Sequence, residues 1–336
     1  MKRSLEKDYE IMIECAVLHY EKGIDQTTVA EKLAISQSQV SKLLRKAREE
    51  GIVQVAIKRP HFKELENKLQ EHFGLRDVRI VQSAENESRE SESSLKQSLG
   101  SETARYFERV ASDGKKVGIA GGQTMYEFVN ALSLPSLRLK IYPLVAREAY
   151  DLQIKNIHAS SLVSLWWCKY IDTEAYRLEL PIIKHRANVN KAINRLLEEI
   201  LGVDFVFTSV GHVNGGSGFR ELMEGLGFNY DDLLNKGVIG DFVGHPITKD
   251  GKQVVKEETK YSRYVLPMPL AEIVCMAESP ERFVILAAGG KKKLDAIAAA
   301  LHGKLCNVLI TDNKSAESLL KRTSDSFRRN GHSIGP

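Results

Sequence analysis

Apolar positions near the amino terminus recur at helical spacing in two short consecutive runs. The break between the runs, at residues 34–36, matches the tight turn of about three to four residues that joins two packed helices. Ser36 is a suitable N-cap for the second helix, and Asp25 or Thr27 is suitable for the first. The apolar residues that define the two faces are Val29, Ala30 and Leu33, then Val40, Leu43, Leu44 and Ala47. The pattern predicts a helix-turn-helix unit.

Flanking segments complete this small unit. The stretch YEIMIECAVLHYEKG predicts a preceding helix that closes the core with Ile11, Ala16, Val17 and Leu18. After Gly51, a helix stop, the stretch GIVQVAI alternates apolar and polar residues as a strand does, so we expect a winged arrangement.

The second helix of the pair begins with polar residues where a core-seeking helix would be apolar. Gln and Ser side chains at the start of such a helix can hydrogen-bond base edges in the major groove, and Lys or Arg side chains after them can neutralise phosphates. An ordinary solvated helix hairpin is the alternative. The predicted DNA-contacting residues are Gln37, Ser38, Gln39, Ser41, Lys42 and Arg45.

Charge is distributed unevenly along the chain. The formal net charge of the 336 residues is only +4, too little by itself to indicate nucleic acid. Residues 37–59 nevertheless contain six Lys or Arg against two Glu, whereas residues 1–36 contain five against seven Asp or Glu. Basic charge is therefore concentrated on the predicted recognition helix and the segment after it, which favours DNA binding.

Short apolar runs alternate with helical patterns over the rest of the chain. A helix is predicted from His61 to a stop at Gly74, then the strand VRIVQ, a mobile Ser- and Glu-rich connection, and a helix near Leu95–Val110. The runs KIYPLVA, FVFTSVG, FVILAAGG and NVLITD are typical of buried strands. The fold class predicted for this region is α/β, a mainly parallel sheet covered by helices.

Two glycine pairs in this region each lie between a strand and a helix. In GIAGGQT, Gly121 and Gly122 allow close backbone approach to a ligand, and the helix start favours an anion such as phosphate. In AAGGKKKLDAIAAAL, one of Lys291, Lys292 and Lys293 can turn toward an anion. The alternative for the first loop is a tight turn that needs glycine for geometry only, and the alternative for the second loop is solvated surface lysines. Neither loop matches a nucleotide-binding motif, so no cofactor is predicted.

A further candidate, Asp241, stands between glycines in GDFVGHPITKDGKQV, where it can accept bonds from sugar hydroxyls or can serve as a turn residue. The KDG that follows predicts a hairpin turn at Asp250 and Gly251.

Composition excludes several classes of protein. No apolar stretch approaches the roughly 20 residues of a membrane span, and the amino terminus lacks the apolar core of a signal peptide, so we expect a cytoplasmic protein. The four cysteines are scattered and are expected to be reduced and buried. Nine dispersed histidines form no ligand pattern, so no metal site is predicted.

The helix-turn-helix stretch and the segments GIAGGQT, GVIGDFVGHPITKDGKQV and AAGGKKKLDAIAAALHGKLCNVLITD together resemble the SorC family of bacterial sugar-responsive transcriptional regulators. The resemblance runs from about Tyr20 to Leu320. It implies a helix-turn-helix domain over residues 1–60, an effector domain over 61–322 similar to sugar-phosphate isomerases and deaminases, and a tail over 323–336. It also implies homodimers or homotetramers that bind operator double-stranded DNA under the control of a phosphorylated sugar.

The resemblance also implies which residues bind the effector. The phosphate loop corresponds to Gly121, Gly122, Gln123 and Thr124. The family's Gly-Asp pair corresponds to Gly240 and Asp241, and its Gly-Gly-x-x-Lys selects Lys293 among the three lysines. The last loop thus supplies Gly289, Gly290 and Lys293.

Some segments depart from the family pattern. AREAYD places Arg147, Glu148 and Asp151 near the expected site, and LPIIKHRA adds Lys184, His185 and Arg186. Arg147 and Arg186 can bind a second anionic group of the effector or can pair with the neighbouring carboxylates.

Two other functions compete with the regulator. An isomerase or deaminase would use His212 in SVGHVNGGSGF with Glu148 or Asp151 as proton-transfer groups, but it would need no helix-turn-helix. A protein-interaction module would use the helix-turn-helix without DNA. The regulator, a non-enzyme, accounts for both halves of the chain.

Overall fold

The computed structural model describes residues 2–53, 62–83, 88–133, 137–148, 174–175, 179–180, 197–213, 218–254, 264–265 and 268–330. The chain divides into two compact units, Met1–Arg59 and Pro60–Pro336. This division lies next to the boundary expected at residue 60.

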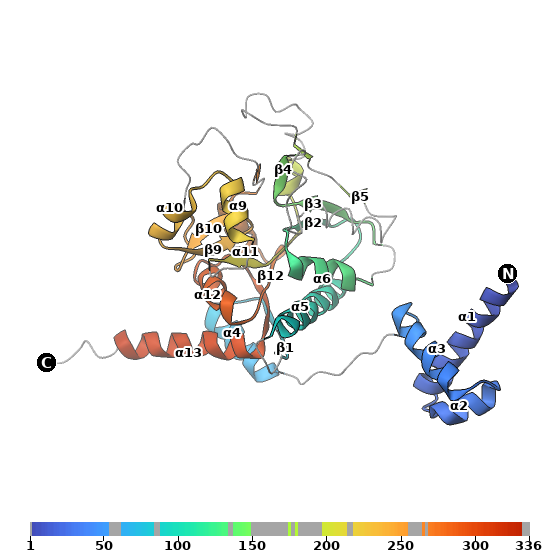
Figure 1. Ribbon diagram of the computed structural model, residues 1–336. Coiled ribbons are helices and arrows are strands. Elements are labelled where there is room, and N and C mark those ends of the chain that lie inside the picture. Colours follow the sequence, from blue (N-terminus) through green and yellow to red (C-terminus); the bar gives the residue numbers. More distant parts are fainter. Residues whose placement is uncertain are drawn as a thin grey trace. The chain divides into compact units, whose positions relative to one another are not determined.

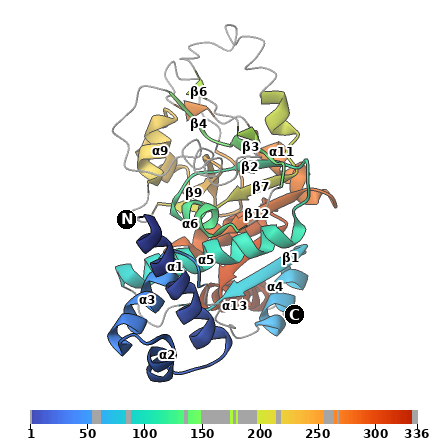
Figure 2. The same ribbon diagram turned by 90° about the vertical axis from the view of Figure 1, so that its right-hand side faces the viewer.

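The amino-terminal unit is a bundle of short helices (Figure 2). It packs its apolar residues, among them Met12, Cys15, Val29, Val40 and Leu44, into one small core. The helices are α1 (Lys2–Ala16), its π-helical continuation η1 (Val17–Glu21), α2 (Gln26–Leu33) and α3 (Gln37–Glu49). The order and spacing of α2 and α3 are those of a helix-turn-helix.

The ends of these helices are set by side-chain caps. Asp25 accepts hydrogen bonds from the backbone N–H groups of Thr27 and Thr28, both at 3.0 Å, and so begins α2. Ala34 ends that helix in the left-handed conformation at φ 53°. Ser36 begins α3 through a reciprocal capping box with Gln39. Of the two predicted caps for α2, Asp25 is the one that the fold uses.

The predicted wing lies largely outside the described residues. Gly51, at φ +74°, follows the end of α3 as expected, and Ile52 and Val53 pack against the core of the unit. Residues 51–53 form a turn and bend rather than a strand. The rest of the predicted strand, residues 54–57, is not among the described residues.

A twisted parallel sheet forms the centre of the larger unit (Figure 1). Within the described residues its seven strands lie in the order β1-β13-β12-β7-β2-β3-β5, and every neighbouring pair is parallel. The strands are β1 (Asp77–Val81), β2 (Lys116–Ile119), β3 (Lys140–Pro143), β5 (Glu174–Ala175), β7 (Phe205–Thr208), β12 (Phe283–Ala287) and β13 (Val308–Asp312). The four buried runs predicted as strands are confirmed.

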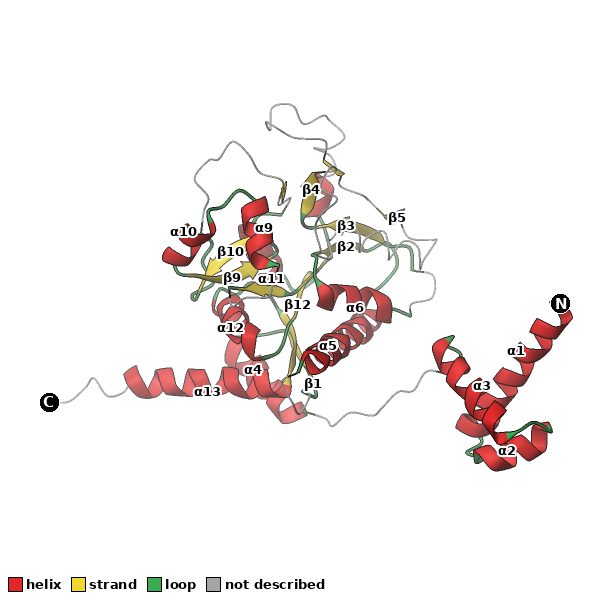
Figure 3. Cartoon of the chain, in the orientation of Figure 1, coloured by secondary structure: helices red, strands yellow, loops and turns green. Residues whose placement is uncertain are grey.

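Helices cover both faces of this sheet, as Figure 3 shows with helices in red and strands in yellow. One face packs against α5 (Arg89–Val110) and α6 (Gln123–Ala131). The other packs against α4 (Lys63–Phe73), α11 (Leu270–Glu278), α12 (Leu294–His302) and α13 (Asn313–Asn330). The predicted α/β class is confirmed as a three-layer architecture.

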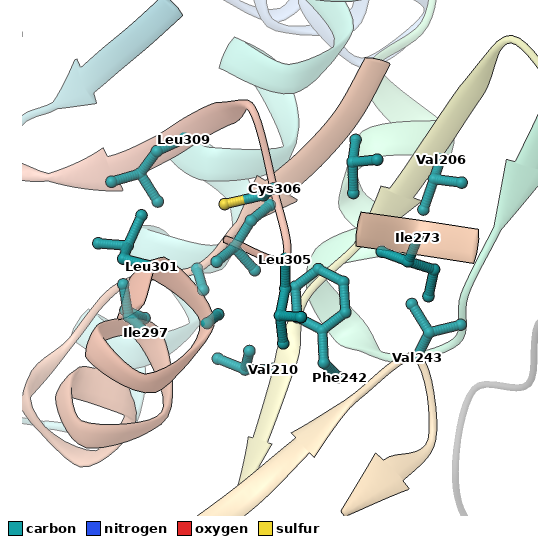
Figure 4. Close-up of a cluster of buried hydrophobic side chains, with 14 of the residues drawn as sticks. Val206, Val210, Phe242, Val243, Ile273, Ile297, Leu301, Leu305, Cys306 and Leu309 are labelled. Carbon is teal, nitrogen blue, oxygen red and sulfur yellow. The ribbon is translucent and has the colours of Figure 1, made fainter. Parts of the chain in front are cut away.

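Alternation along the strands supplies the two cores. In β7, Phe205 and Phe207 join the α5 and α6 side, and Val206 joins the other side. Phe107 of α5 lies edge-on to both phenylalanines, with ring centroids 5.3 and 5.1 Å apart. Figure 4 shows part of the opposite core, where the labelled residues are Val206, Val210, Phe242, Val243, Ile273, Ile297, Leu301, Leu305, Cys306 and Leu309.

Two smaller sheets are formed by strands that lie between strands of the main sheet in sequence. The first is antiparallel, in the order β10-β9-β8, and comprises β8 (Val210–His212), β9 (Val238–Phe242) and β10 (His245–Thr248). Helices α9 (Phe219–Gly225) and α10 (Tyr230–Asn235) pack beside it. The second joins β4 (Ala146–Glu148), β6 (Glu179–Leu180) and β11 (Tyr264–Val265). β8 follows β7 directly and so connects the small antiparallel sheet to the main sheet.

Two predictions need correction. Helix α5 begins at Arg89, with Ser88 as its N-cap, rather than near Leu95, so part of the predicted mobile connection is helical. The side chain of Cys275 is exposed on α11, whereas burial was predicted. Helix α13 runs to Asn330 and so includes the first residues of the segment predicted as a tail. Local sequence alone favoured a loop before α5 because its first turn carries no apolar residue.

Candidate functional site

The strand order of the main sheet changes direction between β2 and β7. From β2 the chain continues to β3 on one side, and from β7 it continues to β12 on the other side. Ligands of open α/β sheets bind outside the carboxyl ends of the strands at such a switch point. The two glycine loops predicted to bind an effector follow β2 and β12, and β7 is the strand between them.

The loop after β2 begins α6 in an unusual backbone conformation. Gly122 is the N-cap of α6 at φ 109° and ψ 165°, a region that is essentially restricted to glycine. Thr124 is buried, and the side-chain amide of Gln123 donates to Glu127 at 2.9 Å on the exposed side of the helix. The described geometry thus leaves the N–H groups at the start of α6 as the main anion-binding feature of this loop.

The loop after β12 repeats this conformation. Gly290, at φ 88° and ψ 151°, is the N-cap of the short 3-10 helix η3 (Lys291–Lys293), which leads into α12. The Nζ atom of Lys293 donates to the hydroxyl of Ser209 at 2.8 Å, and Ser209 lies directly after β7. Lys293 is therefore directed toward the carboxyl end of the strand between the two loops.

Asp241 is buried in β9, next to the same strand end. Its carboxylate accepts a hydrogen bond from the N–H of Gly244 at 2.9 Å, within the two-residue turn that joins β9 to β10. An ideal Cβ on Gly211 would lie 2.1 Å from Oδ1 of Asp241, so only glycine fits beside this carboxylate. Because Lys293 acts electrostatically on Asp241, the two predicted effector residues belong to one cluster.

Burial dominates the protonation of this cluster. Burial raises the pKa of Asp241 to about 6, against the opposing effects of the Gly244 N–H and of Lys293. Burial, with Lys96 next in importance, lowers the pKa of Lys293 to about 8, whereas Asp241 and Glu92 act in the opposite direction. Burial followed by the charge of Lys293 also lowers the pKa of His212. Desolvation on this scale is typical of functional sites.

The first two turns of α5 contribute charges that the sequence pattern does not reveal. Glu92 forms an ion pair with Lys292 at 2.7 Å, and the Leu95 side chain approaches Gly290. Lys96 lies close enough to shift the pKa of Lys293. The sequence pattern predicts a helix that begins near Leu95, and such a helix does not include Glu92.

Other predicted effector residues are not brought to this cluster by the described structure. Arg147 lies in β4, for which only the backbone is described. Asp151, Lys184, His185 and Arg186 lie outside the described residues. The prediction that arginines bind a second anionic group of the effector therefore stays a prediction.

The recognition helix presents a polar face opposite its core face. Val40, Leu44 and Ala47 are buried. The exposed face, at positions i, i+3, i+4 and i+7, comprises Ser38, Ser41, Lys42 and Arg45. Gln37 and Gln39 are exposed on the flanks of this face. The Oε1 atom of Gln39 accepts from the N–H of Ser36 at 3.0 Å, so this side chain also serves the cap.

The described residues contain neither a cluster suited to a metal ion nor a helix suited to a membrane. Among them, no group of three or more His, Cys, Asp or Glu side chains is placed to hold a metal ion. None of the described helices is long and apolar enough to cross a membrane.

Comparison with known families matches the larger unit to a family model. The model of the sugar-binding domain matches residues 60–321, which includes both glycine loops, Asp241 and Lys293. This chain belongs to the SorC family of transcriptional regulators. Its larger unit is the family's sugar-binding domain.

Relatives of known name agree with this assignment. The chain is 27% identical over 333 residues to the deoxyribonucleoside regulator of Bacillus subtilis, with 93% of this chain and 97% of the relative covered. It is 24% identical to the sorbitol operon regulator of Klebsiella pneumoniae, with 94% and 98% covered. Both relatives are named as regulators, which favours a regulator over the isomerase-like enzyme.

A solved structure shows the same fold. The crystal structure of the full-length sorbitol operon regulator SorC from Klebsiella pneumoniae aligns with a TM-score of 0.69 at 22% identity, covering 93% of this chain and 99% of that one. A DeoR family transcriptional regulator from Listeria monocytogenes aligns with a TM-score of 0.61 at 26% identity, covering 76% and 98%. The likeness to the full-length structure extends across both units of this chain.

Proposed function

We propose that this chain regulates a carbohydrate operon by binding operator DNA, with an affinity that a phosphorylated sugar controls. The observation that carries the proposal is the ammonium of Lys293, which is directed to Ser209 at the switch point of the sheet between two glycine-capped helix starts. Helix starts and a lysine ammonium are groups that bind a phosphate dianion.

The remainder of the cluster suits the sugar part of such a ligand. The carboxylate of Asp241 and the imidazole of His212 are both buried polar groups at the same strand end, and both can bond hydroxyl groups. The names of the relatives, a deoxyribonucleoside regulator and a sorbitol operon regulator, support a ligand from sugar or nucleoside metabolism.

DNA binding is assigned to α3. In the proposed complex Ser38 and Ser41 meet base edges while Lys42 and Arg45 contact phosphates, and Gln37 and Gln39 lie at the border of the interface. Dimers or tetramers of the chain would present two such helices to two half-sites. Such an oligomer has one arrangement of subunits with higher DNA affinity and another with lower DNA affinity. The sugar phosphate changes DNA affinity only to the extent that it binds these two arrangements with different affinities.

The test combines ligand binding and DNA binding. Thermal unfolding is followed against a panel of sugar monophosphates, sugar bisphosphates and unphosphorylated sugars, since a ligand of the native state raises the melting temperature. We expect one phosphorylated sugar to stabilise the wild type and the Lys115→Ala control, whose lysine pairs with Asp204 at the amino end of the sheet. Lys293→Ala should lose the shift but keep its affinity for operator DNA in fluorescence anisotropy.

Two outcomes would contradict the proposal. Stabilisation by unphosphorylated sugars alone would show that the effector needs no phosphate group. An increase in melting temperature of the same size in Lys293→Ala as in the wild type would show that Lys293 does not bind the effector.

A further inference from the structure

The backbone N–H of Gly290 is directed into the protein rather than outward. It donates to Oδ2 of Asp312 at 2.8 Å and to the hydroxyl of Ser315 at 3.0 Å. An ideal Cβ on the preceding Gly289 would lie 2.4 Å from the same Oδ2 atom. Close approach to Asp312 therefore explains Gly289, and the positive φ of +88° explains Gly290. The N–H of Gly290 is already bonded within the protein.

Asp312 is a buried carboxylate that is itself held from several directions. Its Oδ2 also accepts from the hydroxyl of Ser315 at 2.6 Å. Its Oδ1 accepts from the N–H of Ser315 at 3.0 Å and from the hydroxyl of Ser83 at 2.5 Å. With only 1% of its surface exposed, this carboxylate depends on these donors in place of water.

The loop carries Lys293 at a fixed offset from Gly290. The N–H of Lys293 donates to the carbonyl of Gly290 at 3.1 Å, closing the single turn of η3. The side chain of Lys293 then extends to Ser209. A change in the direction of the Gly290 peptide would therefore displace the Lys293 ammonium from the end of β7.

We infer that Asp312 and Ser315 are positioning residues, which hold the Gly289–Gly290 backbone so that Lys293 can bind the phosphate of an effector. The inference rests on the proposed function and deepens it. Neither residue needs to touch the ligand, because each acts through the N–H of Gly290. The two serines that donate to Asp312 differ in their contact with Gly290. The hydroxyl of Ser315 accepts from the N–H of Gly290, whereas the hydroxyl of Ser83 donates to Oδ1 of Asp312, which is not the oxygen that Gly290 bonds.

This difference provides a matched test. Inorganic phosphate is titrated into the full chain and its binding is followed by ³¹P NMR, for the wild type, Ser315→Ala, Ser315→Thr and Ser83→Ala. Each alanine variant loses one hydroxyl bonded to Asp312, so general destabilisation should be similar. We expect Ser315→Ala to bind phosphate about fivefold more weakly, the factor that corresponds to one ordinary hydrogen bond. Ser315→Thr keeps the hydroxyl and should restore binding, and Ser83→Ala should bind as the wild type does.

A second readout reports the bond itself. In protein labelled with ¹⁵N-glycine, the amide of Gly290 should exchange with solvent faster in Ser315→Ala than in Ser83→Ala. Equal phosphate affinities and equal exchange in the two alanine variants would overturn the positioning role while leaving Lys293 as the phosphate ligand. Absence of phosphate binding in the wild type would overturn the proposed site and, with it, this inference.

Discussion

The Nζ atom of Lys293 lies 2.8 Å from the hydroxyl of Ser209. This hydrogen bond joins the loop after β12 to the end of β7, two places that are more than eighty residues apart in the chain. It directs a partly buried ammonium to the switch point of the sheet. Among the described residues, no carboxylate forms an ion pair with this ammonium. The energetic consequence is that Lys293 is held for binding at a cost in stability.

Replacement of Lys293 by Met should therefore stabilise the protein at neutral pH. Its folded pKa of about 8 lies below the ordinary value of 10.5, so the cost is fully present below pH 8 and disappears as the pH rises from 8 to 10.5. We expect Lys293→Met to raise the free energy of unfolding by about 1–2 kcal/mol at pH 7, and by less at pH 10. Urea denaturation at both pH values measures the difference. A variant that is less stable at pH 7 would contradict the prediction.

The carboxyl of Asp241 should impose a pH dependence of its own. Because its folded pKa of about 6 is raised above the ordinary 3.8, the folded protein binds this proton more tightly than the unfolded chain does. Its contribution to stability is full below pH 3.8 and is lost as the pH rises through 6. Asp241→Asn should remove this part of the pH profile of unfolding between pH 4 and 6. An unchanged profile would show that Asp241 does not titrate in this range.

Gly122 should be required for its backbone conformation alone. A Cβ at this position would meet nothing within 4 Å, so a penalty on Gly122→Ala can come only from φ of +109°. We expect a loss of roughly 1–3 kcal/mol in the free energy of unfolding. Gly202→Ala is the control, because its Cβ would have a nearest contact of 3.5 Å without a positive φ. Equal stability of the two variants would contradict the explanation.

The capping box of α3 should behave as one energetic unit. Gln39 accepts from the N–H of Ser36, and the hydroxyl of Ser36 accepts from the N–H of Gln39 at 3.2 Å. Each single change, Ser36→Ala or Gln39→Ala, should cost about 1 kcal/mol. The double variant should cost less than the sum, as measured in a double-mutant cycle by thermal unfolding. Strict additivity would indicate that the two bonds form independently.

Lys42 and Arg45 should contribute to DNA binding through phosphates. Removal of either residue should weaken binding to all duplexes alike and should lower the slope of log affinity against log salt concentration by about one. Lys68→Ala serves as the control away from this helix, since Lys68 pairs with Glu64 at 2.6 Å on α4. Salt slopes of the Lys42 and Arg45 variants that equal the slope of the wild type would remove α3 from the DNA interface.

Much of the fold was predictable because its determinants are local. Helical spacing identified α2 and α3, and continuous apolar runs identified β3, β7, β12 and β13. Glycines at the start of α6 and η3 marked the two loops, since the required φ values exclude other residues. The capping residue Ser36 was also evident from sequence.

Contacts between distant segments were decided only by the tertiary structure. Ser209, Asp312 and Glu92 lie in no local pattern that marks them as site residues. Each contributes through a contact with a distant segment: Ser209 with Lys293, Asp312 with Gly290, and Glu92 with Lys292. The pKa shifts of Asp241 and Lys293 likewise depend on burial, which a linear pattern of residues does not specify. Local conformational preference thus determined which elements form, whereas the order of strands in the sheet decided which side chains meet at its carboxyl edge.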